Sequence, residues 1–182
     1  MLTFTLLGGS AIHCVNGSKA LLVFPPKPGS DKEITLLAHP EEAPSEGVIS
    51  WPGEYDFSGV AIRGIGHGEG AAVSYAVEIE GVRCAFFAAP LHDWTDYELE
   101  LLGDIDVLFI PADDVKLAQK LIDQIDPRVL CPLLSKDAQI FEEVLKVCGA
   151  QDKESVDEYK VKGRGSLPVE GRDVVILKAQ KG

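Results

Sequence analysis

Side chains that could hold a metal ion are few in this chain. His39 and Glu41 lie in a polar, proline-containing loop directly after an apolar run at residues 34–38. The run predicts a short buried strand, and the loop after such a strand is the usual place for a site in a layered α/β protein. The chain has 4 histidines, and His13 falls within another predicted strand. A two-metal hydrolytic site needs about six or seven protein ligands, so the sequence predicts no complete site of that kind.

A site for one metal ion stays open as an alternative. His39, Glu41 and His67 could offer two imidazoles and one carboxylate with water in the fourth position, which is the open pattern of catalytic zinc. Glu42 or His92 could then serve as the base. The competing interpretation is that His39 caps the loop at the strand end and Glu41 is a solvated acid. No His-x-His or HExxH spacing supports the metal.

Composition and charge restrict the classes of partner. The chain has 29 acidic and 17 basic residues and a formal net charge of −12. A field of this sign repels phosphate backbones and anionic lipid, so we expect neither nucleic acid nor a membrane as a partner. The four cysteines form no CxxC pair, which favours reduced thiols. With no apparent signal peptide or membrane span, the sequence predicts one cytoplasmic domain over residues 1–182.

The pattern of apolar residues predicts strands first and helices later. The first half is a series of short runs typical of strands, at residues 2–7, 11–15, 20–24, 34–38, 48–51, 60–65, 74–79 and 82–87. In the second half, Thr95 and Glu98 form a capping-box pattern that predicts a helix ending at Leu102. Apolar spacing predicts two more helices, one ending before Pro127 and one closed by Gly149. Further strands are expected at residues 107–110, 129–131, 159–161 and 174–177. Strands that pack on strands, with helices between the later ones, predict two face-to-face sheets with helices outside.

The ordered set of these pieces resembles the metallo-β-lactamase fold, and in particular its short members related to the ascorbate-phosphate lactonases. The resemblance rests on Leu7-Gly8-Gly9-Ser10, residues 21–26, Gly53-Glu54-Tyr55 with Gly59-Val60, Glu78-Ile79-Glu80-Gly81-Val82-Arg83, Thr95-Asp96, residues 102–111, Ile125-Asp126-Pro127 and Ser166-Leu167-Pro168. Together these segments span nearly the whole chain. The resemblance implies an α/β (α+β) protein built as a four-layer αββα sandwich, with two mixed sheets and helices outside.

The positions that match the family's metal-site motifs have mostly lost their ligands. The histidine and aspartate positions of those motifs fall, in chain order, on Gly9, Phe24, His39, Glu41, Ala43, Pro44, Ala89 and Leu134. His67 lies near the family's loop histidine, and His92 matches a histidine near the site that is not a primary ligand. The resemblance therefore implies a vestigial cleft made of His39, Glu41, His67, His92, Gly9, Phe24, Ala89 and Leu134. Because the replacements are small or apolar, we expect the former metal cavity to be filled by side chains, with Phe24 and Leu134 in the space.

The preferred interpretation is a non-catalytic protein of this fold that acts as a binding or assembly subunit. It has no catalytic residue, requires no cofactor, and associates with a protein partner or with itself as a homodimer. One alternative is a mononuclear metal-dependent hydrolase that uses zinc on His39, Glu41 and His67. Another is a small-molecule binder in the former cleft, with His67, His92 and Trp94 at its mouth.

Overall fold

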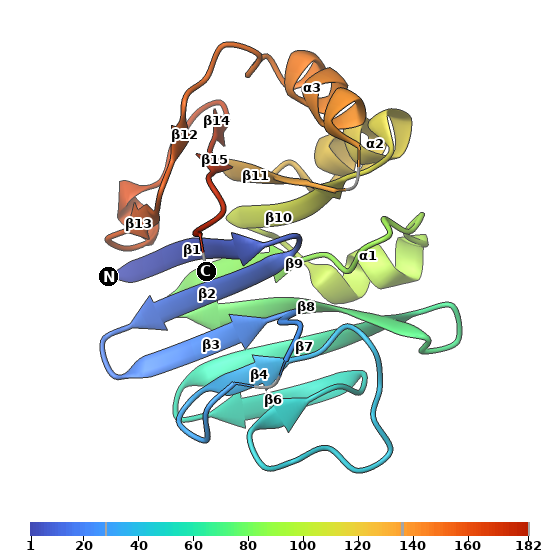
Figure 1. The fold of residues 1–182 in the computed structure, drawn as a ribbon, viewed down its shortest axis with the longest axis vertical. Helices are drawn as coiled ribbons and strands as arrows, with labels where there is room; N and C mark the ends of the chain where they lie inside the picture. The colour runs from blue at the N-terminus through green and yellow to red at the C-terminus, as the bar shows by residue number, and fades with distance from the viewer. Residues whose placement is uncertain (28, 136, 182) are drawn as a thin grey trace.

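Two mixed β-sheets pack face to face in the computed structural model, which describes residues 1–27, 29–135 and 137–181 (Figure 1). In this described part, the first sheet has six strands in the order β13 (Tyr159–Val161), β1 (Leu2–Gly8), β2 (Ala11–Asn16), β3 (Lys19–Val23), β4 (Ile34–Leu36) and β5 (Val48–Ile49). The second has seven strands in the order β14 (Asp173–Val174), β11 (Val129–Leu134), β10 (Val107–Ala112), β9 (Val82–Phe86), β8 (Ala72–Ile79), β7 (Val60–His67) and β6 (Gly53–Phe57). A small parallel pair joins β12 (Ser155–Val156) to β15 (Ile176–Leu177).

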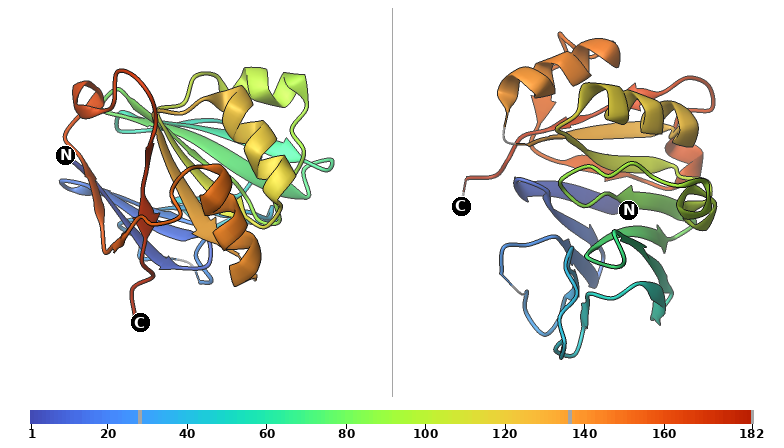
Figure 2. Two further views of the ribbon diagram at one scale, coloured as in Figure 1. Left: turned by 90° about the horizontal axis from the view of Figure 1, so that it is seen from above. Right: turned by 90° about the vertical axis from the view of Figure 1, so that its right-hand side faces the viewer.

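The α-helices of the described residues all contact the seven-stranded sheet. They are α1 (Asp96–Leu102), α2 (Val115–Ile125) and α3 (Ala138–Val147), and a short 3₁₀ helix, η1, spans Arg164–Ser166. Figure 2 shows the α-helices on the side of this sheet that faces away from the six-stranded sheet. The predicted sandwich of two mixed sheets is confirmed. In the described residues the α-helices pack on the outer face of the seven-stranded sheet, so the layers run sheet, sheet, helices instead of the predicted four (Figure 2).

The sequence gives a physical reason for the missing layer. The crossover between the parallel strands β3 and β4 is the place where a helix could cover the first sheet, but it contains prolines at positions 25, 26 and 28. Proline removes a backbone donor and breaks a helix interior, and the described residues of this connection form no helix. The outer face that it leaves is partly polar, with Thr3, Thr5 and His13 half-buried.

Alternation of residue types builds the main core between the sheets. On β1, Leu2, Phe4 and Leu6 are buried against the second sheet, while the threonines between them point outward. Phe86 and Phe109 stack in the same core with ring centroids 4.8 Å apart. The helices bury their apolar faces on the other side of the seven-stranded sheet and form a second core. The seven-stranded sheet is therefore covered on both of its faces.

The helix predictions are confirmed closely, and two strands, β6 and β12, were missed. Thr95 and Glu98 form the predicted capping box at the start of α1. The third helix is capped by Asp137. Strand β6 begins at Gly53, directly after Pro52, and these are residue types that favour turns. None of the helices in the described residues is long and apolar enough to cross a membrane.

Candidate functional site

The eight predicted cleft residues lie at or just beyond strand ends along one edge of the sandwich. Strand pairing shows this, because Ile12 lies opposite both Leu6 and Val23, so the β1–β2 turn is next to the end of β3. In the other sheet, β9, β10 and β11 run parallel and end together. The two sheets meet at this edge, where the Val73 amide donates to the Ala38 carbonyl at 2.8 Å. The predicted residues therefore share this edge of the sandwich, called here the rim. They lie in separate local environments along it.

The first environment is the His39 loop, defined here as residues 37–50. The exposed His39 places its Nδ1 3.0 Å from the Ala71 carbonyl oxygen. The buried Tyr75 hydroxyl holds the base of the loop, since it donates to the Leu37 carbonyl at 2.6 Å and lies 3.1 Å from the Ile49 carbonyl. The loop borders a shallow cavity of about 440 Å³, which Phe24, His39 and Glu41 help to line. This cavity is open, so Phe24 fills only part of the space.

Glu41 contributes its backbone rather than its carboxylate to the loop. Its amide donates to the Ser50 hydroxyl at 3.0 Å, and its carbonyl accepts the Trp51 indole N–H at 2.7 Å. The side chain is exposed. Burial and hydrogen bonding therefore do not direct the Glu41 carboxylate toward either histidine, which agrees with a solvated acid.

The second environment is the His67 network, which consists of His67, Ser74 and Glu98. His67 Nε2 lies 3.0 Å from Ser74 Oγ, and His67 Nδ1 lies 3.3 Å from Glu98 Oε1. The His67 side chain is 2% exposed. Its ring stacks on His92 with centroids 5.0 Å apart and meets the buried Trp94 edge-on at 4.5 Å. Burial lowers the pKa of His67 below its ordinary value, and the Glu98 carboxylate opposes that shift.

The partners of the His67 network define its proton arrangement. A carboxylate only accepts hydrogen bonds, so Nδ1 of His67 carries the proton toward Glu98 and Nε2 accepts the hydroxyl proton of Ser74. Donors and acceptors follow the same order as in a catalytic triad, in which an acid orients a histidine base that faces a serine nucleophile. However, Ser74 is 1% exposed and its oxygen also accepts the Ala88 amide at 2.9 Å. Because no substrate can reach a hydroxyl buried in this way, the network joins β7, β8 and α1 rather than attacking a substrate.

Two members of this network were not predicted from the sequence. Ser74 lies in a run that only indicates a strand, and Glu98 was assigned to the helix cap. Glu98 fulfils both roles, because its Oε2 accepts the Thr95 amide at 2.8 Å while its Oε1 faces His67. The capping box was the available signal that this carboxylate has a fixed position.

The remaining predicted cleft residues lie apart from the histidines. Gly9 occupies the tight β1–β2 turn with a φ of 54°, a backbone conformation that favours glycine. Ala89 borders a separate cavity of about 540 Å³ at the ends of β10 and β11. Leu134 is 45% exposed, which contradicts the expectation that it fills a buried space. Strand alternation explains this, since Leu133 points into the core and turns the next side chain outward.

The acidic side chains at the Ala89 cavity accept hydrogen bonds from backbone amides. Asp113 accepts the Leu91 amide at 3.0 Å, and Asp114 accepts the Leu117 amide at 2.9 Å as the cap of α2. Asp137 caps α3 in the same way. Within residues 1–27, 29–135 and 137–181, no three His, Cys, Asp or Glu side chains form a group that could hold a metal ion.

The cysteines offer no alternative chemistry at this edge. Cys14, Cys84 and Cys131 are buried and Cys148 is partly buried, and none forms a disulfide. Burial raises the pKa of Cys14 and of Cys131 to about 12. A thiol that stays protonated is a poor nucleophile and a poor metal ligand.

Comparisons with known proteins identify the fold. No family model matches the chain. A Rhodopirellula baltica protein, elongation factor 4 2, is 34% identical over 120 residues. That match covers 62% of this chain and 19% of the other protein, so the chain spans about a fifth of the length of the curated relative that it matches.

Three solved structures match almost the whole chain. A proposed Zn-dependent hydrolase of the metallo-β-lactamase superfamily from Thermotoga maritima has a TM-score of 0.77 at 23% identity, covering 99% of this chain and 100% of its own. A proposed metal-dependent hydrolase from Parabacteroides distasonis has a TM-score of 0.65 at 18% identity, with coverages of 98% and 94%. The metallo-β-lactamase fold protein YhfI from Bacillus subtilis has a TM-score of 0.61 at 11% identity, with coverages of 98% and 97%. At these identities the likeness concerns the backbone and not the activity, and it shows that this chain has the metallo-β-lactamase fold.

Proposed function

We propose that this protein is a non-catalytic member of its fold that acts by binding, as a binding or assembly subunit. The proposal rests on the kinds of potential metal-binding side chains that are present at the rim. Zinc, which the fold's relatives imply, is held by three or four Cys, His, Asp or Glu side chains. The described residues contain no group of three such side chains at one point, so the rim does not fit that ion.

The mononuclear alternative requires His39, Glu41 and His67 to converge. His67 is buried with one ring nitrogen facing Ser74 and the other facing Glu98, so neither nitrogen has a lone pair directed at a metal. His39 and Glu41 are exposed, and His39 Nδ1 faces the Ala71 carbonyl oxygen. Binding a metal would require His67 to leave its partners, and leaving buried polar groups unpaired costs about 1–3 kcal/mol each.

The small-molecule alternative places His67, His92 and Trp94 at the mouth of the old cleft. Trp94 is 4% exposed and stacks on Phe87 with ring centroids 4.2 Å apart. His67 is equally enclosed, so of the three only His92 retains partial exposure. These contacts favour a packed interior over a binding mouth at this position.

Metal content and hydrolysis test the proposal together. Protein purified without chelators should contain far less than one transition-metal ion per chain by elemental mass spectrometry, with the same result for His39→Ala. Hydrolysis of phosphodiester, lactone and thioester substrates should stay at the level of the buffer with and without added zinc. Stoichiometric metal that is lost in His39→Ala, or hydrolysis that a chelator removes, would overturn the proposal.

A further inference from the structure

The strongest unassigned feature is a groove between α1 and residues 51–54, called here the aromatic groove. It has a volume of about 670 Å³, within the range of about 300–1,000 Å³ that is typical of ligand sites. Trp51 and Tyr97 form part of its lining on separate elements, and Arg63, Glu69 and Glu98 also line it. The groove is on the helix-covered side of the sheet, so it is separate from the His39 cavity.

The two aromatic side chains are exposed although they are large. Trp51 is 49% exposed and Tyr97 is 68% exposed. Trp51 is nevertheless held in place, because its indole N–H donates to the Glu41 carbonyl at 2.7 Å and its own carbonyl accepts the Tyr55 hydroxyl at 2.9 Å. Tryptophan, tyrosine and arginine are the residues most enriched at energetically important positions of protein interfaces. A fixed, half-exposed tryptophan thus offers a preorganised contact surface.

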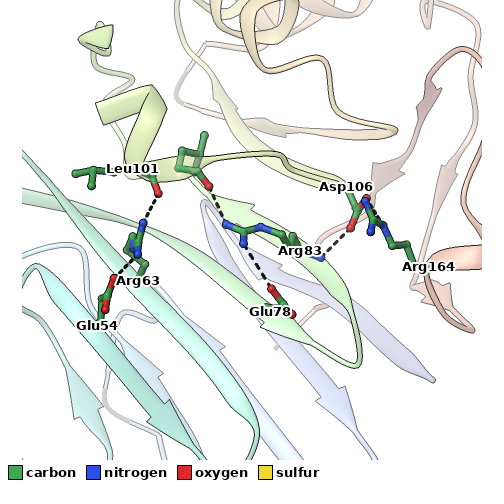
Figure 3. A network of polar contacts seen from close by, with 8 residues as sticks. Glu54, Arg63, Glu78, Arg83, Leu101, Asp106 and Arg164 are labelled. Carbon is green, nitrogen blue, oxygen red and sulfur yellow. Dashed lines mark hydrogen bonds and ion pairs between the residues drawn. The ribbon is translucent and has the colours of Figure 1, made fainter. Parts of the chain in front are cut away.

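The charged side chains that line the groove favour an occupant of one sign of charge. Arg63 is already neutralised locally, since it donates to the Leu101 carbonyl at 3.0 Å and pairs with Glu54 (Figure 3). Glu69 also lines the groove, is exposed, and forms no ion pair with any described residue. The whole chain has a net charge of −12. A groove lined by both a carboxylate and exposed aromatic rings can attract a cationic side chain, through ion pairing and cation–π contact.

We propose that the aromatic groove binds a segment of a partner protein that carries arginine or lysine side chains. This deepens the proposed binding function and rests on it. A cationic side chain of the segment lies over the ring of Trp51 or Tyr97 with Glu69 as its counter-charge. The open shape and volume of the groove suit a short peptide segment.

Peptide titration by calorimetry tests this inference with the intact chain. The probes are three capped hexapeptides that are identical except for a central pair, which is arginine, norleucine or glutamate. The arginine peptide should bind at least about ten-fold more tightly than the glutamate peptide. Because Trp94 is buried, a change in tryptophan fluorescence on binding should disappear in Trp51→Phe.

Matched variants separate the groove from the general negative charge. Glu69→Gln and Tyr97→Ala should each weaken the arginine peptide about five- to ten-fold. Glu142→Gln removes one exposed carboxylate on α3, and it should leave affinity unchanged. Equal affinities in Glu69→Gln, Tyr97→Ala and Glu142→Gln would overturn the inference, as would equal binding of the glutamate peptide.

The oligomeric state and the metal content of the protein distinguish two other outcomes. Sedimentation equilibrium that shows a dimer dissociated by Tyr97→Ala would mean that a second copy occupies the groove, which would also overturn the partner assignment. The metal content of the same preparation is independent of the peptides. Metal-free protein that fails to bind the arginine peptide would refute the groove alone, whereas stoichiometric metal would refute the non-catalytic function.

Discussion

Polar side chains are buried and paired with one another in one region of the rim, and they are exposed to solvent in another. The His67 network is enclosed, and its members face one another at 3.0 and 3.3 Å. The His39 loop is open, and its histidine forms a single hydrogen bond to the Ala71 carbonyl. A buried polar group must be paired, whereas an exposed one can be paired by water. His39 is therefore accessible to solvent but joins no group of three potential metal ligands in the described residues, whereas His67 has several partners but is closed to solvent.

The largest effect expected from this difference is the loss of stability in His67→Ala. The substitution removes a ring that packs on His92 and Trp94 and leaves Ser74 and Glu98 without their shared partner. We expect the free energy of unfolding to fall by about 3 kcal/mol, measured by urea denaturation. His92→Ala, which removes a half-buried ring from the same stack, is the control and should cost about 1 kcal/mol. Wild-type stability in His67→Ala would show that the two regions do not differ.

A second substitution, Tyr75→Phe, tests what holds the His39 loop. Tyr75→Phe removes only the hydroxyl that donates to the Leu37 carbonyl near one end of the His39 loop. The unpaired carbonyl should lower the free energy of unfolding by about 1–2 kcal/mol. Hydrogen exchange should increase at amides of residues 37–50. The exposed Tyr97 provides the matched control, and Tyr97→Phe should alter neither quantity. Unchanged exchange in Tyr75→Phe would mean that the loop is held by other contacts.

The sequence predicted local structure well because local structure depends on neighbouring residues. The Thr95–Glu98 capping box, the helix ending before Pro127 and the alternation on β1 all follow from spacing within one turn or one strand. The His67–Glu98 contact was not predictable in this way, because 31 residues separate its members. It depends on how β7 packs against α1, which no short pattern specifies.

The family resemblance located the rim but not the environment of each residue on it. Strand ends brought Gly9, Phe24, Ala89 and Leu134 to the expected edge, since the order of strands is a property of the fold. Whether a side chain at a strand end points inward depends on its place in the alternation, and Leu134 points outward. Strand β6 was missed because Pro52 and Gly53 are turn-forming residues, although they directly precede or begin a five-residue strand.

Acid should weaken the enclosed His67 network. Burial lowers the pKa of His67 in the folded protein, so the unfolded chain binds a proton more tightly, near the ordinary pKa of 6.5. The stabilisation from neutral, buried His67 is therefore present above pH 6.5 and is lost as pH falls toward the folded pKa. The thermal midpoint should decrease between pH 7.5 and pH 5.5, and less steeply in His67→Ala. We expect a smaller change than for the substitutions, because the Glu98 carboxylate opposes the shift. An identical slope in both proteins would assign the pH dependence to other groups.

The smallest effect expected is that of His39→Ala. The side chain is exposed and its hydrogen bond to Ala71 competes with water, so its loss should cost about 0.5 kcal/mol or less. The same pair of proteins also shows whether the open histidine belongs to a metal site. A ligand that binds only the folded state raises the thermal midpoint, so a zinc site using His39 would make wild type more stable in zinc and leave His39→Ala unchanged. We expect zinc to shift neither midpoint, because His67, the second imidazole that such a site needs, faces Ser74 and Glu98 instead. A zinc-dependent rise confined to wild type would show that the two regions act as one site.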